Sequence, residues 1–139
     1  MGRRSPVKLK PSADALLELI DLMQDLAAEG RSVLTILMDP ALPPKAWAHW
    51  PEDDACDRRT GYRWYYHCHA GAGRIEGEHG HFHVFADGGE HGVVTHLVAV
   101  SVDARGWPLA LVAPNRWVTD DHWQPAASVL RLVERFAMY

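Results

Sequence analysis

The chain has 139 residues, of which 47% are hydrophobic and 23% are charged. This length holds one domain of ordinary size, and the globular composition excludes a disordered, collagen-like or membrane-embedded chain. The net charge is −4, but residues 1–11 carry four basic side chains and no acidic one. We therefore expect residues 1–11 to form a flexible basic tail and residues 12–139 to form a single domain. Because that domain is acidic and offers no concentrated basic surface for nucleic-acid phosphates, we expect no nucleic-acid partner.

The two cysteines, Cys56 and Cys68, do not form a CxxC motif or a disulfide framework. Arg3 and Arg4 are not followed by an uninterrupted apolar stretch, and the longest apolar-rich run, residues 93–102, is half a membrane span. The sequence thus predicts a cytoplasmic protein in a reducing compartment, with no membrane partner.

Two helices are predicted at the start of the domain. Ser12 is the expected N-cap of the first helix, and Gly30 its C-cap. Apolar residues at spacings of three and four predict one buried stripe on this helix: Leu16, Leu19, Ile20, Met23, Leu26 and Ala27. Ser32 can cap a short second helix that ends before Asp39 and Pro40. We interpret the proline-containing residues 40–51 as an irregular loop pinned by Trp47 and Trp50. Asp53, Asp54 and Asp57 are expected in a solvated turn.

A pattern of period two, rich in aromatic and β-branched residues, begins at Tyr62. It predicts four strands near residues 62–69, 79–86, 93–103 and 107–113, with the last three in an antiparallel meander and Pro108 at an edge or strand entry. A final helix follows Thr119, with an apolar face formed by Val129, Leu130, Val133 and Phe136. The predicted fold class is α+β: N-terminal helices, a four-stranded antiparallel sheet and a C-terminal helix.

Histidine is concentrated in the predicted sheet: seven of the nine histidines lie between His67 and His96. Alternation along a strand places His79, His81 and His83 on one face, with the Cβ atoms of neighbouring members about 6 to 7 Å apart. The position of His96 depends on the turn. A two-residue turn at Gly88 and Gly89 pairs His81 with His96, a turn at Asp87 and Gly88 pairs His79 with His96, and a three-residue loop sends His96 to the other face.

Two of these three turns give a face with three histidines, and we expect His81, His83 and His96 to be metal ligands. Such a set with one open position suits catalytic zinc and can also hold copper or ferrous iron. His67 or His69 can supply a fourth ligand, although the spacing leaves open which face this pair joins. Glu78 and Asp87 are candidates for orienting the ligands, and Glu78 is the best placed carboxylate for proton transfer.

Asn115 and Arg116 follow the last predicted strand directly, and a polar pair at a strand end is a suitable place to contact a small-molecule substrate. Two hypotheses follow. The first is a mononuclear metal-binding protein, with an enzyme that activates water or dioxygen as its stronger form. The second is a non-catalytic module that binds a ligand or protein through a metal-free histidine and aromatic face. The sequence leaves catalysis and oligomeric state open.

Three motifs carry a resemblance: residues 77–85 (GEHGHFHVF), residues 95–97 (THL) and residues 115–119 (NRWVT). With these motifs the chain resembles an uncharacterised bacterial domain family over most of its length, from the first helix to the last. The resemblance implies a small bacterial protein and brings no activity with it. The His81 and His83 pair is also similar to the HxH of cupins, without their glutamate and third-histidine spacing, and to the ligand strand of α-class carbonic anhydrases in local geometry.

Overall fold

The computed structural model describes residues 13–69, 75–87, 94–113 and 124–139. In chain order the elements are α1 (Ala13–Ala28), α2 (Val33–Leu37), β1 (Trp50–Asp57), β2 (Tyr62–Cys68), β3 (Gly80–Ala86), β4 (Thr95–Val102), β5 (Pro108–Val112) and α4 (Ala126–Glu134). The strands form one sheet in the order β1-β2-β3-β4-β5, and every neighbouring pair is antiparallel. The α+β class is therefore confirmed, but the sheet has five strands instead of four. The basic tail and the Ser12 cap lie outside the described residues.

The ends of the N-terminal helices follow from local capping. Gly30 takes a positive φ of 69°, and the N–H of Arg31 donates to the carbonyl of Leu26, which satisfies the last turn of α1. Ser32 caps α2 because its hydroxyl accepts from the N–H of Thr35 while the Thr35 hydroxyl accepts from the N–H of Ser32. These reciprocal bonds confirm the predicted start of the second helix.

Strand β1 corrects the sequence prediction, which gave a loop and a solvated acidic turn for this region. Its sequence (WPEDDACD) contains proline and acids, which are depleted in strands, so the pattern hid it. The strand is tolerated because it lies at the sheet edge and pairs on one side only, with β2. Asp57 is buried instead of solvated, and its carboxylate accepts from the N–H groups of Arg59 and Tyr139.

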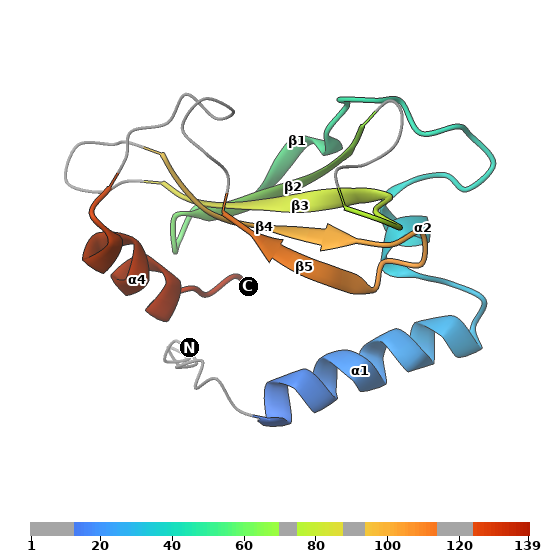
Figure 1. Cartoon of the computed structure of the whole chain (residues 1–139), viewed down its shortest axis with the longest axis horizontal. Helices are drawn as coiled ribbons and strands as arrows, with labels where there is room; N and C mark the ends of the chain where they lie inside the picture. The colour runs from blue at the N-terminus through green and yellow to red at the C-terminus, as the bar shows by residue number, and fades with distance from the viewer. Residues whose placement is uncertain (1–12, 70–74, 88–93, 114–123) are drawn as a thin grey trace.

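One face of the sheet carries the apolar core. Tyr66 and Val102 lie on this face and pack with Leu34 of α2. The C-terminal region joins the same face, because the Tyr62 hydroxyl donates to the carbonyl of Leu132 and the Tyr62 ring meets Phe136. Figure 1 shows α1 and α4 on one side of the sheet. The opposite face is the one that carries the histidines.

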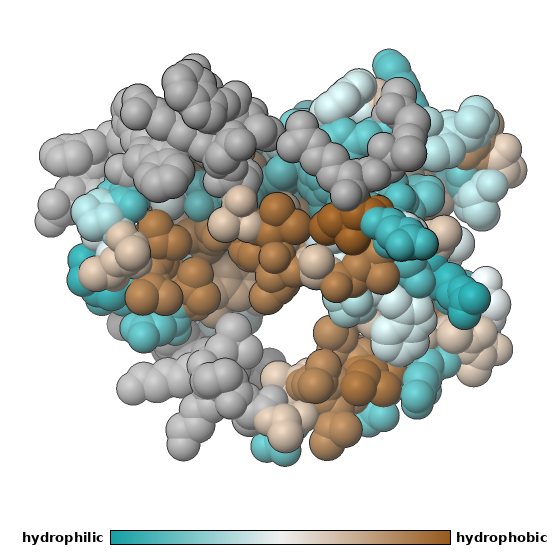
Figure 2. All heavy atoms as spheres, in the orientation of Figure 1, coloured by the Kyte–Doolittle hydropathy of each residue, from teal (hydrophilic) through white to brown (hydrophobic). Residues whose placement is uncertain are grey.

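Helix α1 is less buried than its apolar stripe predicts. Of the stripe only Met23 is buried, whereas Leu16 and Leu19 are exposed. Figure 2 shows apolar side chains gathered over α1 and over the neighbouring sheet. The C-terminal part of α1, around Met23 and Leu26, borders a pocket of about 310 Å³ shared with Trp107. The prediction of a wholly buried stripe was wrong, because α1 uses mainly this end to meet the domain.

Candidate metal centre

The histidine face is built by the pairing of β2 with β3. His67 pairs with His81, and Tyr65 pairs with His83. Directly paired residues of antiparallel strands point to the same side of the sheet, so these four side chains share one face. Because Tyr66 and Phe82 alternate with them toward the core, the same two strands serve the core and the histidine face.

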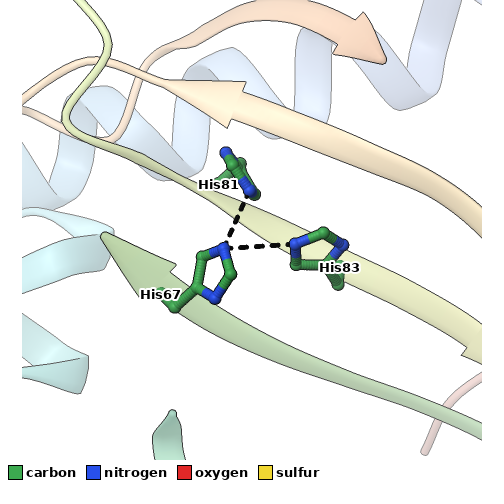
Figure 3. Close-up of side chains that lie close together, drawn as sticks. All are labelled: His67, His81 and His83. Atoms are coloured by element: carbon green, nitrogen blue, oxygen red, sulfur yellow. Dashed lines mark hydrogen bonds between the residues drawn. The ribbon is translucent and has the colours of Figure 1, made fainter. Parts of the chain in front are cut away.

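Three imidazoles converge at the centre of this face. Nε2 of His67 lies 2.9 Å from Nε2 of His81 and 3.3 Å from Nε2 of His83. Figure 3 shows the rings turned toward one another from two adjacent strands. Three nitrogens held around one zinc at about 2.0 to 2.1 Å in tetrahedral geometry are separated by about 3.3 Å, so small ring movements suffice to admit an ion. The structure thus answers which face His67 joins.

Burial keeps the imidazoles of His67 and His83 neutral. His67 is 8% exposed and His83 is 5% exposed. Burial, reinforced by the neighbouring imidazoles, lowers the pKa of His67 to about 4 and that of His83 to about 2. A neutral imidazole offers a lone pair, whereas a protonated one cannot bind a metal. At neutral pH these two rings are therefore ready to act as ligands.

Glu78 fixes the orientation of His81. Its carboxylate oxygen Oε1 accepts a hydrogen bond from Nδ1 of His81 at 2.9 Å, and its side chain is 5% exposed. Burial acts to raise the pKa of Glu78, but interactions led by the hydrogen bond with His81 outweigh it and leave this pKa below its usual value. With Nδ1 donating, Nε2 of His81 keeps its lone pair and points to His67, as in a carboxylate–histidine–metal arrangement.

His96 reaches the same face by a route that the sequence did not predict. His81 pairs with Ser101 and His96 pairs with Phe85, so both predicted registers are wrong. The connection between Ala86 and Thr95 is much longer than the predicted two-residue turns. A bulge in β4 leaves Leu97 without a partner and restores His96 to the histidine face. There its Nε2 lies 2.7 Å from Nδ1 of His83.

His69 follows the end of β2 and lies at the rim of the cluster. Its Nε2 lies 3.4 Å from Nε2 of His81, and its ring meets the indole of Trp47 at a centroid distance of 4.5 Å. The Trp47 side chain is exposed, and the backbone N–H of Trp47 donates to the carbonyl of Cys68. Both members of the His67 and His69 pair therefore join the face of His81 and His83.

Other residues of the sequence analysis lie elsewhere. His79 was expected on the histidine face, but its Nδ1 is hydrogen-bonded to the Tyr66 hydroxyl on the core side. Asp87, expected beside the ligands, pairs with Arg63 at 3.4 Å. Asn115 and Arg116 lie outside the described residues. Cys68 is buried and pairs with Gly80 of β3.

Sequence reasoning missed two residues next to the cluster, His49 and Asp54. Nδ1 of His49 lies 2.8 Å from Oδ1 of Asp54, and the His49 ring is stacked on Tyr65. Nothing in the spacing of these residues indicated the contact, because it depends on the unpredicted strand β1.

Comparison with known families supports the resemblance seen in the motifs. The model of a family described as Domain of unknown function (DUF6969) matches residues 13–139. The chain belongs to this family. Neither a curated protein nor a solved structure matches the chain significantly. Among the described residues of this DUF6969 member, no helix has the length and apolar character needed to cross a membrane. The family carries no assigned activity, and the histidine cluster is the feature of this chain that bears on its function.

Proposed function

We propose that this DUF6969 protein binds one divalent transition metal through Nε2 of His67, His81 and His83. The observation that carries the proposal is the convergence of these three side chains, each of which offers one ring nitrogen within 4.8 Å of those of the other two, at a largely buried site. Three neutral imidazoles are a typical ligand set for zinc and also accept copper or ferrous iron. Zinc is our first choice, because three imidazoles with a fourth position left open are an established ligand set of catalytic zinc.

Two further residues, Glu78 and His96, form hydrogen bonds with the proposed ligands and hold their rings in orientation. Glu78 holds Nδ1 of His81. For Nε2 of His83 to bind a metal, its Nδ1–H must donate to Nε2 of His96, and the 2.7 Å contact suits that bond. We therefore assign orientation of the ligands to Glu78 and His96. Ligand residues are commonly fixed by such second hydrogen bonds.

We also propose that a fourth position serves chemistry. A metal held by three imidazoles keeps one position for water or a substrate oxygen. Such a metal lowers the pKa of the group bound there. His69 is the nearest candidate for a fourth protein ligand, which would close the site and favour a structural role. Asn115 and Arg116 remain our proposed contacts to a small-molecule substrate.

Metal analysis of protein prepared without a histidine tag tests the proposal. We expect one zinc, iron or copper ion per chain, lost in the variant His81→Ala with His83→Ala and retained in His79→Asn, which changes a histidine on the core side of the sheet. Addition of the metal to 100 times its dissociation constant should stabilise the fold by about 2.7 kcal/mol. Absence of bound metal together with no thermal stabilisation by zinc, iron or copper would refute the metal site and favour the non-catalytic binding module.

A further inference from the structure

Edge strand β1 is interrupted beside the histidine cluster. Trp50 pairs with Tyr66 and Ala55 pairs with Trp64, so residues 51–54 lie opposite Tyr65 alone. This four-residue bulge contains Asp54 at a φ of 53°, in the left-handed region that non-glycine residues seldom adopt. Bulges of this kind redirect a side chain and are frequent next to active sites.

The redirected side chain of Asp54 holds His49. Oδ1 of Asp54 lies 2.8 Å from Nδ1 of His49. An ionised carboxylate can only accept a hydrogen bond, so Nδ1 of His49 carries the proton and Nε2 keeps a lone pair. A carboxylate that fixes a histidine in this way prepares the second ring nitrogen to accept a proton.

Tyr65 places the His49 ring over the histidine face. The two rings are stacked at a centroid distance of 3.7 Å and an interplanar angle of 7°. The Tyr65 ring in turn meets His83 at 5.0 Å and His67 at 5.6 Å. The bulge, the carboxylate and the stack thus combine to hold one histidine from a loop against Tyr65, whose ring contacts two proposed ligands.

The ring of His49 is farther from the cluster than the ring pairs that are directly hydrogen-bonded within it. Its ring centroid lies 6.4 Å from that of His67. The ring pairs in direct hydrogen-bonding contact are closer: 4.7 Å for His67 and His81, and 4.9 Å for His83 and His96. The side chain of His49 is 40% exposed, so its ring can be reached from solvent.

We propose that His49, held by Asp54, is the proton acceptor of the proposed metal centre. Its Nε2 takes a proton from a water or hydroxyl group bound beside His67. The O–H bond of that group breaks, its electron pair stays on the oxygen as the nucleophile, and a new N–H bond forms on His49. The carboxylate of Asp54 balances the charge of the resulting imidazolium. This inference rests on the proposed metal function and adds the acid–base residue that the three ligands lack.

A purely structural role accounts poorly for the arrangement. A partly exposed histidine–aspartate pair contributes little stability. Asp54 also takes a left-handed backbone, which aspartate adopts more readily than most residues but which an extended strand does not require. Strained backbone of this kind persists where the surrounding structure imposes it and is concentrated at functional sites.

Cobalt-loaded protein tests the inference, because its visible absorption reports the ionisation of a group bound to the metal. In His49→Phe, which keeps a ring on Tyr65 but has no nitrogen, we expect the pH midpoint of the spectral change to rise by about one unit. Asp54→Asn should move the midpoint in the same direction. Hydrolysis of 4-nitrophenyl acetate should fall about 100-fold in both variants. The neighbouring exposed residue provides the control, Asp53→Asn, which should behave as wild type in both measurements.

The outcomes separate this inference from the proposed function. Two results would overturn the role of His49 and leave the metal site intact, provided that the protein is fully loaded with cobalt. Either the wild-type spectrum shows no pH-dependent change, or the midpoint of that change is the same in wild type, His49→Phe and Asp54→Asn. Failure of the wild-type protein to bind cobalt or zinc would overturn both. The role of His49 is supported if wild type and His49→Phe bind equal amounts of cobalt and the pH midpoint of the spectral change is displaced in His49→Phe and Asp54→Asn but not in Asp53→Asn.

Discussion

Nδ1 of His83 lies 2.7 Å from Nε2 of His96, although their backbones are not paired with each other. His83 pairs with Ala99 and His96 pairs with Phe85. The bulge at Leu97 produces the contact: without it, Phe85 would pair with Leu97 and His96 would point to the core face. The orientation of a proposed ligand therefore depends on one extra residue in the neighbouring strand.

We expect His96→Ala to weaken metal binding without abolishing it. Loss of the bond to Nδ1 of His83 should lower the affinity for zinc about 10- to 100-fold, because the ring loses its fixed tautomer and orientation. His83→Ala, which removes a proposed ligand, should abolish stoichiometric binding. Competition with a chromophoric chelator measures both affinities. An equal and complete loss in the two variants would instead make His96 a ligand.

Glu78→Gln tests the carboxylate that holds His81. The amide keeps the size of the side chain but carries no charge, so we expect zinc affinity to fall about 10- to 100-fold while the fold is retained. Isothermal titration with zinc gives the affinity. The exposed Glu29, which pairs with Arg31 at the end of α1, provides the matched control Glu29→Gln, which should bind as wild type.

The metal-free protein should lose stability as the pH falls below neutrality. The pKa of His67 and that of His96 are each lowered to about 4 by burial, whereas an unfolded chain titrates its histidines near 6.5. Between these values the unfolded state binds more protons than the folded state, so the free energy of unfolding rises with pH in this window. The contribution of these histidines to stability reaches its full value above the window.

Urea unfolding at pH 7.5, 6.0 and 5.0 after treatment with a chelator measures this dependence. Replacement of one buried imidazole, as in His67→Phe, should reduce the slope between pH 6.5 and 5. A slope that is unchanged in this variant would show that other groups cause the acid sensitivity.

Gly80→Ala should destabilise the fold strongly. A Cβ atom at this position would collide with the Tyr66 hydroxyl and the carbonyl oxygen of His67, neither of which can move without breaking packed structure. We expect a cost of about 2 to 3 kcal/mol. Gly30→Ala is a matched control, because its Cβ would meet no atom and only the positive φ is penalised, at about 1 kcal/mol. Chemical denaturation compares the two, and an equal loss would contradict the proposed collision.

The sequence by itself determined the fold class, the last four strands and the existence of a histidine face. These features depend on residues that are close in sequence: the caps at Ser32 and Gly30, and the alternation of side chains from Tyr62 onward. It did not reveal β1, because an edge strand that pairs on one side tolerates a proline and acids that the pattern excludes.

Only the tertiary structure decided which histidines meet. Register between strands depends on long connections and on the bulges in β1 and β4, and a shift of one residue exchanges the faces of the sheet. The tertiary structure placed His67 at the centre of the cluster and His96 against Nδ1 of His83. It also placed His49 near them, through its contacts with Asp54 and Tyr65. Contacts between residues far apart in the chain come from pairing and packing, and the one-dimensional pattern does not encode them directly.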